Sequence, residues 1–138
     1  MEDDGFTLIE LLVVVVVLAA LAAIAIPSYL SQSQKAFDAQ MKTSLRSLAT
    51  NEESFMTTNN RYGTIAELVG SGATIARSGG VTLTLVKYDP TNGYCLEATH
   101  RNVSGGAWYW DSIAGGLQPS GTTACPNVTT GTAGDSLP

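Results

Sequence analysis

The N-terminal segment "DDGFTLIELLVVVVVLAALAAIAIP", residues 3–27, decides what kind of fold the chain has. Residues 11–26 are all aliphatic, whereas Glu10 puts one carboxylate at the head of this run. At about 1.5 Å per helical residue, residues 6–30 are long enough to cross a hydrocarbon core of about 30 Å. A carboxylate in such a segment costs on the order of 2.5–3.5 kcal/mol at the membrane centre and less near an end. Glu10 is therefore the first candidate for a functional residue.

Three ordinary explanations compete for this segment. A secretory signal peptide could end at residues 23–25, which have the small-x-small pattern, but the residues ahead of the apolar run are acidic rather than basic. A simple membrane anchor fits the length, with Glu10 reaching the headgroups. A buried core helix is disfavoured, because a chain of 138 residues is too short to surround so apolar a helix.

Composition limits the function further. The length fits one domain, or one domain plus an anchor. A formal net charge of −5 argues against a nucleic-acid partner bound through a basic surface. Cys95 and Cys125 form no CxxC pair, and His100 alone cannot complete a zinc site, so a structural disulfide in an oxidising compartment is favoured. We find no catalytic set, phosphate-binding glycine loop, metal cluster or cofactor motif, and we expect no enzyme.

Two topology signals disagree. Lys35, Lys42 and Arg46 follow the apolar segment, and the positive-inside rule would place them in the cytoplasm. The cysteine pair predicts the opposite side. We follow the cysteines, and we expect basic residues upstream of Met1.

The segment "GFTLIELLVVVVVLAALAAIAIPSYLSQSQKA", residues 5–36, resembles the N-terminus of type IV prepilins. The shared pattern is Gly5, then Phe-Thr-Leu-Ile-Glu at residues 6–10, an aliphatic run, and Pro27. The resemblance implies that residues 1–5 are a leader, which a prepilin peptidase removes between Gly5 and Phe6 before methylating the new N-terminus. Glu10 then matches the glutamate that pairs with the α-amine of a neighbouring subunit, so that two otherwise costly charges neutralise each other.

The resemblance also implies a function. The chain would be a structural subunit of an extracellular type IV pilus, a helical homo-oligomer that supports attachment, motility or DNA uptake. Its precursor would cross the cytoplasmic membrane once, with the head outside, and would need assembly-platform and motor proteins. Two alternatives stay open: a pseudopilin of a type II secretion or competence apparatus, in which Asp111 and Asp135 could bind a cation, and a monomeric membrane-anchored binding module.

Helical periodicity continues beyond the apolar segment. We expect one helix of about 75 Å from Phe6 to about residue 56, with a kink or an unwound turn at Pro27, a region that can melt in filaments of the resembling family. Asp38, Lys42 and Arg46 share another face at i,i+4 spacing, which predicts weak ion pairs. The apolar stripe of the second half consists of Phe37, Met41, Leu45, Leu48 and Phe55.

The rest of residues 31–138 predicts a globular head. Thr64 and Glu67 predict a capping box for a short helix at residues 64–70. Period-two patterns and turn residues predict strands, which would make an α+β fold with a sheet of three or four antiparallel strands against the long helix, like a pilin head. The expected strands are residues 81–88, 94–100 and 107–112, with a weak fourth at residues 113–118.

Two further expectations concern the head. Trp108 and Trp110 share one strand face and Tyr109 takes the other, so that at least one face packs in the core. The resemblance implies that Cys95 and Cys125 close a C-terminal loop. The polar segment at residues 127–138 predicts a mobile tail.

Overall fold

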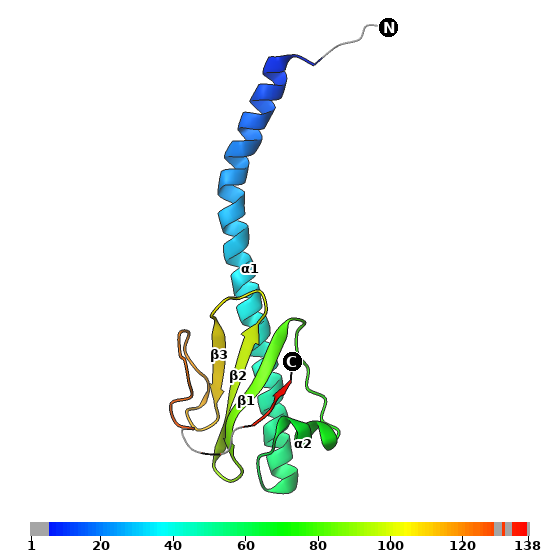
Figure 1. Ribbon diagram of the computed structural model, residues 1–138, viewed down its shortest axis with the longest axis vertical. Helices are drawn as coiled ribbons and strands as arrows, with labels where there is room; N and C mark the ends of the chain where they lie inside the picture. Colours follow the sequence, from blue (N-terminus) through cyan, green and yellow to red (C-terminus); the bar gives the residue numbers. More distant parts are fainter. Residues whose placement is uncertain (1–5, 129–130, 132–133, 138) are drawn as a thin grey trace. The chain divides into compact units, whose positions relative to one another are not determined.

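The computed structural model describes residues 6–128, 131 and 134–137, and it divides into two compact units after Lys35. Helix α1, Leu8–Asn59, supplies the regular structure of the first unit and the long helix of the second (Figure 1). It is close to the helix expected from residue 6 to about residue 56. Asn60 follows with a φ of 56°, a left-handed conformation that ends helices and that asparagine tolerates.

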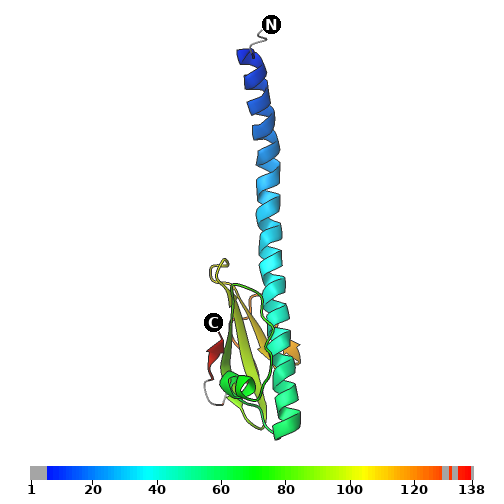
Figure 2. The same cartoon turned by 90° about the vertical axis from the view of Figure 1, so that its right-hand side faces the viewer.

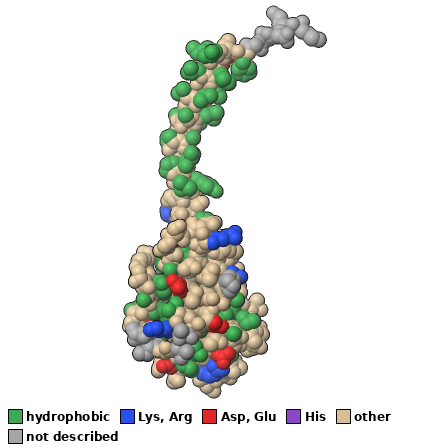
Figure 3. Space-filling model, viewed as in Figure 1, with side chains coloured by type: hydrophobic (Ala, Val, Ile, Leu, Met, Phe, Trp, Pro, Cys, Tyr) green, Lys and Arg blue, Asp and Glu red, His purple; other side chains and the backbone are tan. Residues whose placement is uncertain are grey.

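In the first unit, α1 has no polar face between Leu11 and Pro27. The side chains of residues 6–32 are all exposed, and Figure 3 shows hydrophobic side chains covering this part of the helix. Among the described residues, α1 is the one helix that could cross a membrane by its length and composition. An apolar surface of this kind is stable only in lipid or among other apolar helices.

In the second unit, α1 lies along one face of an antiparallel sheet (Figure 2). The predicted apolar stripe faces the sheet: Met41, Leu45 and Leu48 are fully buried, and Phe55 is nearly so. Phe37, at the end of the stripe, stacks on His100 with 4.4 Å between the ring centroids. The hydrophobic core of the head therefore lies between this stripe and the inner faces of the strands.

The sheet has five strands, one more than the upper limit that the sequence predicted. Neighbouring strands are antiparallel, in the order β4-β3-β2-β1-β5. The three long strands occur where period-two patterns predicted them, and β4 is the weak fourth. The strands are β1 Val81–Asp89, β2 Gly93–His100, β3 Ala107–Asp111, β4 Gly116–Leu117 and β5 Ser136–Leu137.

Helix α2, Ile65–Gly70, begins with the predicted capping box. The Thr64 hydroxyl accepts from the Glu67 N–H at 3.1 Å, and the Glu67 carboxylate accepts from the Thr64 N–H at 2.9 Å. Ile65 and Leu68 are buried in the core. The loop after α1 is therefore held by a local sequence motif at its far end.

The expectation of a mobile C-terminal tail is wrong for residues 134–137, where the chain completes the sheet. Ser136–Leu137 pairs with β1 as β5, and Leu137 packs against the core. The Asp135 carboxylate accepts the N–H groups of Ile65 and Ala66, both at 2.8 Å, at the start of α2. These contacts join segments about 70 residues apart in sequence, so no local pattern could predict them.

Replacing Asp135 with alanine should lower the free energy of unfolding of the head by about 1–2 kcal/mol, because two N–H groups at a helix start lose their acceptor. Urea titration of the full chain in detergent, followed by tryptophan fluorescence, measures the change. Ser136→Ala at an exposed neighbouring position is the matched control. An unchanged midpoint for Asp135→Ala would show that these two hydrogen bonds contribute nothing to the stability of the head.

Candidate functional site

The N-terminal end of α1 is organised by Thr7 and Glu10. The Thr7 N–H and hydroxyl both donate to Glu10 Oε2, at 2.9 and 2.6 Å, and the Glu10 N–H donates to Thr7 Oγ1 at 3.3 Å. This reciprocal arrangement is a capping box, which satisfies two of the N–H groups that a helix start leaves without partners. The predicted Gly5 and the rest of the leader lie outside the described residues.

Glu10 is the only charged side chain in the sequence between residues 6 and 34. It lies in a shallow hollow on the helix surface, lined otherwise by Phe6, Ile9, Val13 and Val14. A carboxylate has about four lone-pair positions, and the hydrogen bonds from Thr7 use only one of the two oxygens. Glu10 can therefore keep its contacts with Thr7 and also accept a second, cationic partner.

Pro27, the other predicted assembly residue, lies inside α1. The helix continues through it, without the unwound turn that was one of two expectations for this position. Proline has no N–H, so the bond that would reach the carbonyl of Ala23 is absent. The isolated subunit thus has a weakened turn within its apolar segment, but an intact helix.

Cys95 and Cys125 form the expected disulfide, with 5.9 Å between their Cα atoms and a sequence separation of 30. Both are buried, and Val86, Tyr109 and Val128 pack around them on the outer face of the sheet. The chain-entropy model gives roughly 3–4 kcal/mol for closing a loop of this length. The bond closes a loop that carries β3 and β4.

Asp111 and Asp135, the two candidate cation ligands, have a different role in the structure. Asp111 is fully buried, and its carboxylate accepts four backbone N–H groups. The donors are those of Ile113 and Ala114 at 2.9 Å, Asn127 at 2.8 Å and Val128 at 3.3 Å. Asp135 binds the start of α2 in the same manner. The carboxylates of Asp111 and Asp135 thus fix the C-terminal segment at two separate points, through hydrogen bonds with backbone N–H groups.

The ion pair predicted between Asp38 and Lys42 is not formed. Both side chains contact Trp108 instead. Its indole N–H donates to Asp38 Oδ1 at 3.1 Å, and the Lys42 ammonium lies 3.7 Å from the ring centroid. The structure shows an ion pair elsewhere, between Arg61 and Glu67 at 2.7 Å. Trp108 and Trp110 both pack against the core, as one of the predicted faces requires.

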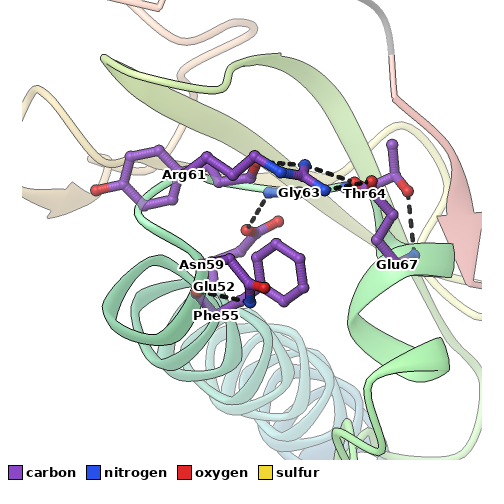
Figure 4. A network of polar contacts seen from close by, with 8 residues as sticks. Glu52, Phe55, Asn59, Arg61, Gly63, Thr64 and Glu67 are labelled. Atoms are coloured by element: carbon purple, nitrogen blue, oxygen red, sulfur yellow. Dashed lines mark hydrogen bonds and ion pairs between the residues drawn. The ribbon is translucent and has the colours of Figure 1, made fainter.

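Glu52 is a buried acid that the sequence analysis missed, although its spacing of four residues from Leu48 and three from Phe55 puts it on the stripe side of α1. Its side chain is fully buried, and the Gly63 N–H donates to its Oε2 at 3.3 Å, while Oε1 has no partner among the described residues. Figure 4 shows Glu52 beneath the loop that holds Arg61 and Gly63, and the Arg61 side chain reaches from this loop to Glu67 of α2. Burial, mainly, together with the charges of the surrounding acids raises the pKa of Glu52 to about 7, although the hydrogen bond from the Gly63 N–H acts to lower it.

Glu67 has the opposite environment, although it lies nearby. Two hydrogen bonds from the Arg61 guanidinium, at 2.7 and 3.1 Å, and one from the Thr64 N–H lower the pKa of Glu67 to about 2. Glu67 is therefore ionised at physiological pH, whereas Glu52 exchanges its proton near neutrality.

Comparison with known proteins identifies a matching N-terminal motif and two related proteins. The prokaryotic N-terminal methylation motif matches residues 3–26. The type IV wide pilus major component PilA4 of Thermus thermophilus is 34% identical over 106 residues, which cover 76% of this chain and 78% of that protein. The type IV major pilin protein PilA of Myxococcus xanthus is 41% identical over 69 residues, which cover 50% of this chain but only 31% of that protein.

An apolar N-terminal helix with a methylation motif, continuing as the spine of a small antiparallel sheet, defines the class of pilin-like α+β proteins. The similarity to PilA4 over about three quarters of both chains identifies the family within this class. This chain belongs to the type IV pilins.

Replacing Glu52 with glutamine should flatten the dependence of head stability on pH. The folded chain keeps a proton that the unfolded chain releases at its ordinary pKa of 4.5, so stability falls as the pH rises from 4.5 to about 7. The gap between these values corresponds to about 3 kcal/mol.

The test for Glu52 is denaturant unfolding of the full chain in detergent at a series of pH values from 4 to 8, wild type against Glu52→Gln. The variant should gain stability over the wild type across this window and hold the gain above it. Glu97→Gln, an acid on strand β2 that is not among the charges acting on the pKa of Glu52, is the control. Parallel pH curves for wild type and Glu52→Gln would contradict the assignment.

Proposed function

We propose that this chain is a structural, non-enzymatic subunit of an extracellular type IV pilus, made from a precursor whose residues 1–5 are removed. Cleavage between Gly5 and Phe6 would free an amine next to Thr7, and N-methylation of Phe6 would keep its positive charge at neutral pH. The observation that carries the proposal is the lone carboxylate of Glu10 on an otherwise apolar, fully exposed helix surface.

Electrostatics explains why this surface would favour assembly. Bundling the apolar halves of α1 removes their side chains from lipid or water, but it also buries the carboxylate of Glu10. The ammonium of Phe6 on a neighbouring subunit neutralises it, and each charge would be strongly unfavourable without the other. Glu10 thereby specifies the axial offset between neighbours, which apolar contacts alone leave undefined.

The same apolar segment also suggests the location of the precursor and the proteins that would act on it. Before assembly, residues 6–30 would span the cytoplasmic membrane once, with residues 31–138 on the outside, where the disulfide is stable. Prepilin peptidase would process the precursor, and an assembly platform with motor proteins would extract it from the membrane. Attachment, motility and DNA uptake are properties that the filament, rather than one subunit, would have.

Two named relatives support a pilus over the alternatives. Both are described as major subunits of type IV pili, and one of them aligns with most of this chain. Electron microscopy of cells with antibody against the head distinguishes a pilus from a pseudopilin, because a pilus subunit should label long surface filaments.

Mass spectrometry of protein sheared from the producing cells should find a chain that begins at Phe6 and carries one added methyl group on its N-terminal nitrogen. A chain that begins at Ile26 would indicate a secretory signal peptide, and an uncut Met1 would indicate a permanent anchor. Either result would refute the proposed processing.

Glu10→Gln should abolish filament assembly, although the precursor is still made and cleaved. Glutamine keeps an acceptor for Thr7, but it leaves the neighbour's ammonium unpaired in an apolar bundle, typically a loss of about 3–5 kcal/mol. The measurement is the amount of filament sheared from cells, with the membrane-bound subunit as reference. Thr7→Ser is the control, because it keeps the hydroxyl. A Glu10→Gln variant that forms filaments at the wild-type level would contradict the proposed role.

A further inference from the structure

One end of the head is the end at which the chain enters it from the apolar segment. The second unit begins at Ala36, and Phe37 stacks on His100, the last residue of β2. The start of β1, the end of β2 and the start of β3 are paired with one another, so they all lie at this end (Figure 1). We call it the entry end of the head. The turn between β1 and β2 lies at the opposite end.

Two arginines from separate parts of the chain meet at the entry end. The Arg77 guanidinium, ahead of β1, donates to the Val81 carbonyl at 2.8 Å. Arg101 directly follows β2, and its backbone N–H donates to the Gly80 carbonyl at 3.0 Å. A Cβ on Gly80 would come within 3.2 Å of Arg101 Nε, so the arginine side chain runs alongside this glycine. Both arginines are exposed, and together they bring two positive charges to the start of β1.

Helix α1 adds two basic residues at the same end. The Lys42 ammonium lies 3.7 Å from the ring centroid of Trp108 in β3, and Arg46 is exposed one turn farther along the helix. Asp38 is the one acid that the described residues place here, and it accepts the Trp108 indole N–H. Figure 3 shows basic side chains at this end of the head. We call the four bases the basic surface: Lys42, Arg46, Arg77 and Arg101.

The charges of the head are thus separated in space. The other acids lie in the second half of α1, in α2, farther along the strands or in the C-terminal segment: Glu52, Glu53, Glu67, Asp89, Glu97, Asp111 and Asp135. Within the residues that the structure describes, no carboxylate forms an ion pair with any member of the basic surface. A chain with an excess of acids therefore has a local positive field at the entry end, which attracts anions.

The entry end is also the part of the head that the chain connects to the membrane. The segment proposed to span the bilayer ends at Leu30, and the helical residues from there to Ala36 span about 9 Å. This tether keeps the entry end close to the lipid headgroups at any angle between the two units. Anionic headgroups attract clustered Lys and Arg over about one Debye length, which is about 10 Å at 0.1 M salt.

A lipid partner also accounts for the topology signals that disagree in the sequence. Lys35, Lys42 and Arg46 would be cytoplasmic by the positive-inside rule, whereas the proposed function has the head outside. Arg77 and Arg101 join them only through the fold, so the positive charge at this end is larger than the sequence near the apolar segment indicates. On the outer side of the membrane, these charges need an anionic partner other than the cytoplasmic leaflet.

We infer that the basic surface binds anionic phospholipid headgroups on the outer leaflet of the cytoplasmic membrane, and that it holds the head of the precursor there before assembly. This inference rests on the proposed function, because it needs a precursor that spans the membrane with its head outside. The contact is electrostatic and involves exposed side chains, so salt weakens it and the head can leave the membrane when a filament forms.

Fluorescence quenching tests this contact in nanodiscs that each hold one copy of the full chain. A fluorophore is attached to Ser104→Cys, in the exposed loop after β2, and the lipid headgroups carry a nitroxide quencher. Quenching should rise several-fold when phosphatidylglycerol is mixed into a phosphatidylcholine bilayer. It should fall back in about 1 M salt, where the Debye length is about 3 Å. The same fluorophore on Thr91→Cys, in the turn at the opposite end, is the control and should not respond.

Charge variants show whether the basic surface causes the response. Arg77→Gln/Arg101→Gln should abolish it, whereas Arg77→Lys/Arg101→Lys keeps both charges and should preserve it. Asp38→Asn keeps an acceptor for the Trp108 indole but removes the acid, so it should increase the quenching. Denaturant unfolding checks that each variant is folded, and Asp38→Asn keeps the test valid if the glutamine variant is not.

Unchanged quenching at Ser104→Cys in the anionic bilayer would overturn the inference. A response that occurs only in vesicles crowded with the chain would also overturn it, because the basic surface would then bind a second copy. Both results would leave the proposed function intact. The proposed function itself fails if a membrane-impermeant thiol reagent cannot label Ser104→Cys from outside in spheroplasts, since the head would then lie in the cytoplasm.

Discussion

The structure depends on one constraint: a helix surface of nearly thirty residues that carries a single charge. Such a surface requires lipid or other apolar helices around it, and the carboxylate of Glu10 requires a polar partner in either environment. In one chain, Thr7 supplies that partner through a capping box. One oxygen of Glu10 remains for a cation, and the family's N-terminal processing would produce a cation a few residues away.

In the head, the same helix has a different environment. Beyond residue 36, α1 has one apolar stripe, and a five-stranded sheet covers it. Two acids then fix the C-terminal segment: Asp111 binds the chain after the disulfide, and Asp135 joins the last strand to α2. A small core thus gains stability from a covalent bond and from carboxylates that accept backbone N–H groups, which are strong hydrogen bonds.

The sequence predicted what local patterns encode. Spacings of three and four residues located the stripe of α1, alternation located β1 to β3, and Thr64 with Glu67 located α2. The missed features all depend on contacts between distant segments. Strand β5 has only two residues and is defined by its partner β1. Glu52 looks like any acid on a helix until the Gly63 loop covers it, and Trp108 competes with a pair that spacing alone favoured.

The central claim is that Glu10 gains the terminal amine of a neighbouring subunit as its partner. A cryo-electron microscopy map of the filament, at a resolution that places side chains, tests it most directly. The account predicts that the map shows the methylated Phe6 nitrogen of one subunit within ion-pair distance of the Glu10 carboxylate of the next, along an unbroken seam of apolar side chains. A map in which Glu10 contacts only Thr7 of its own chain, with the neighbour's N-terminus elsewhere, would contradict it.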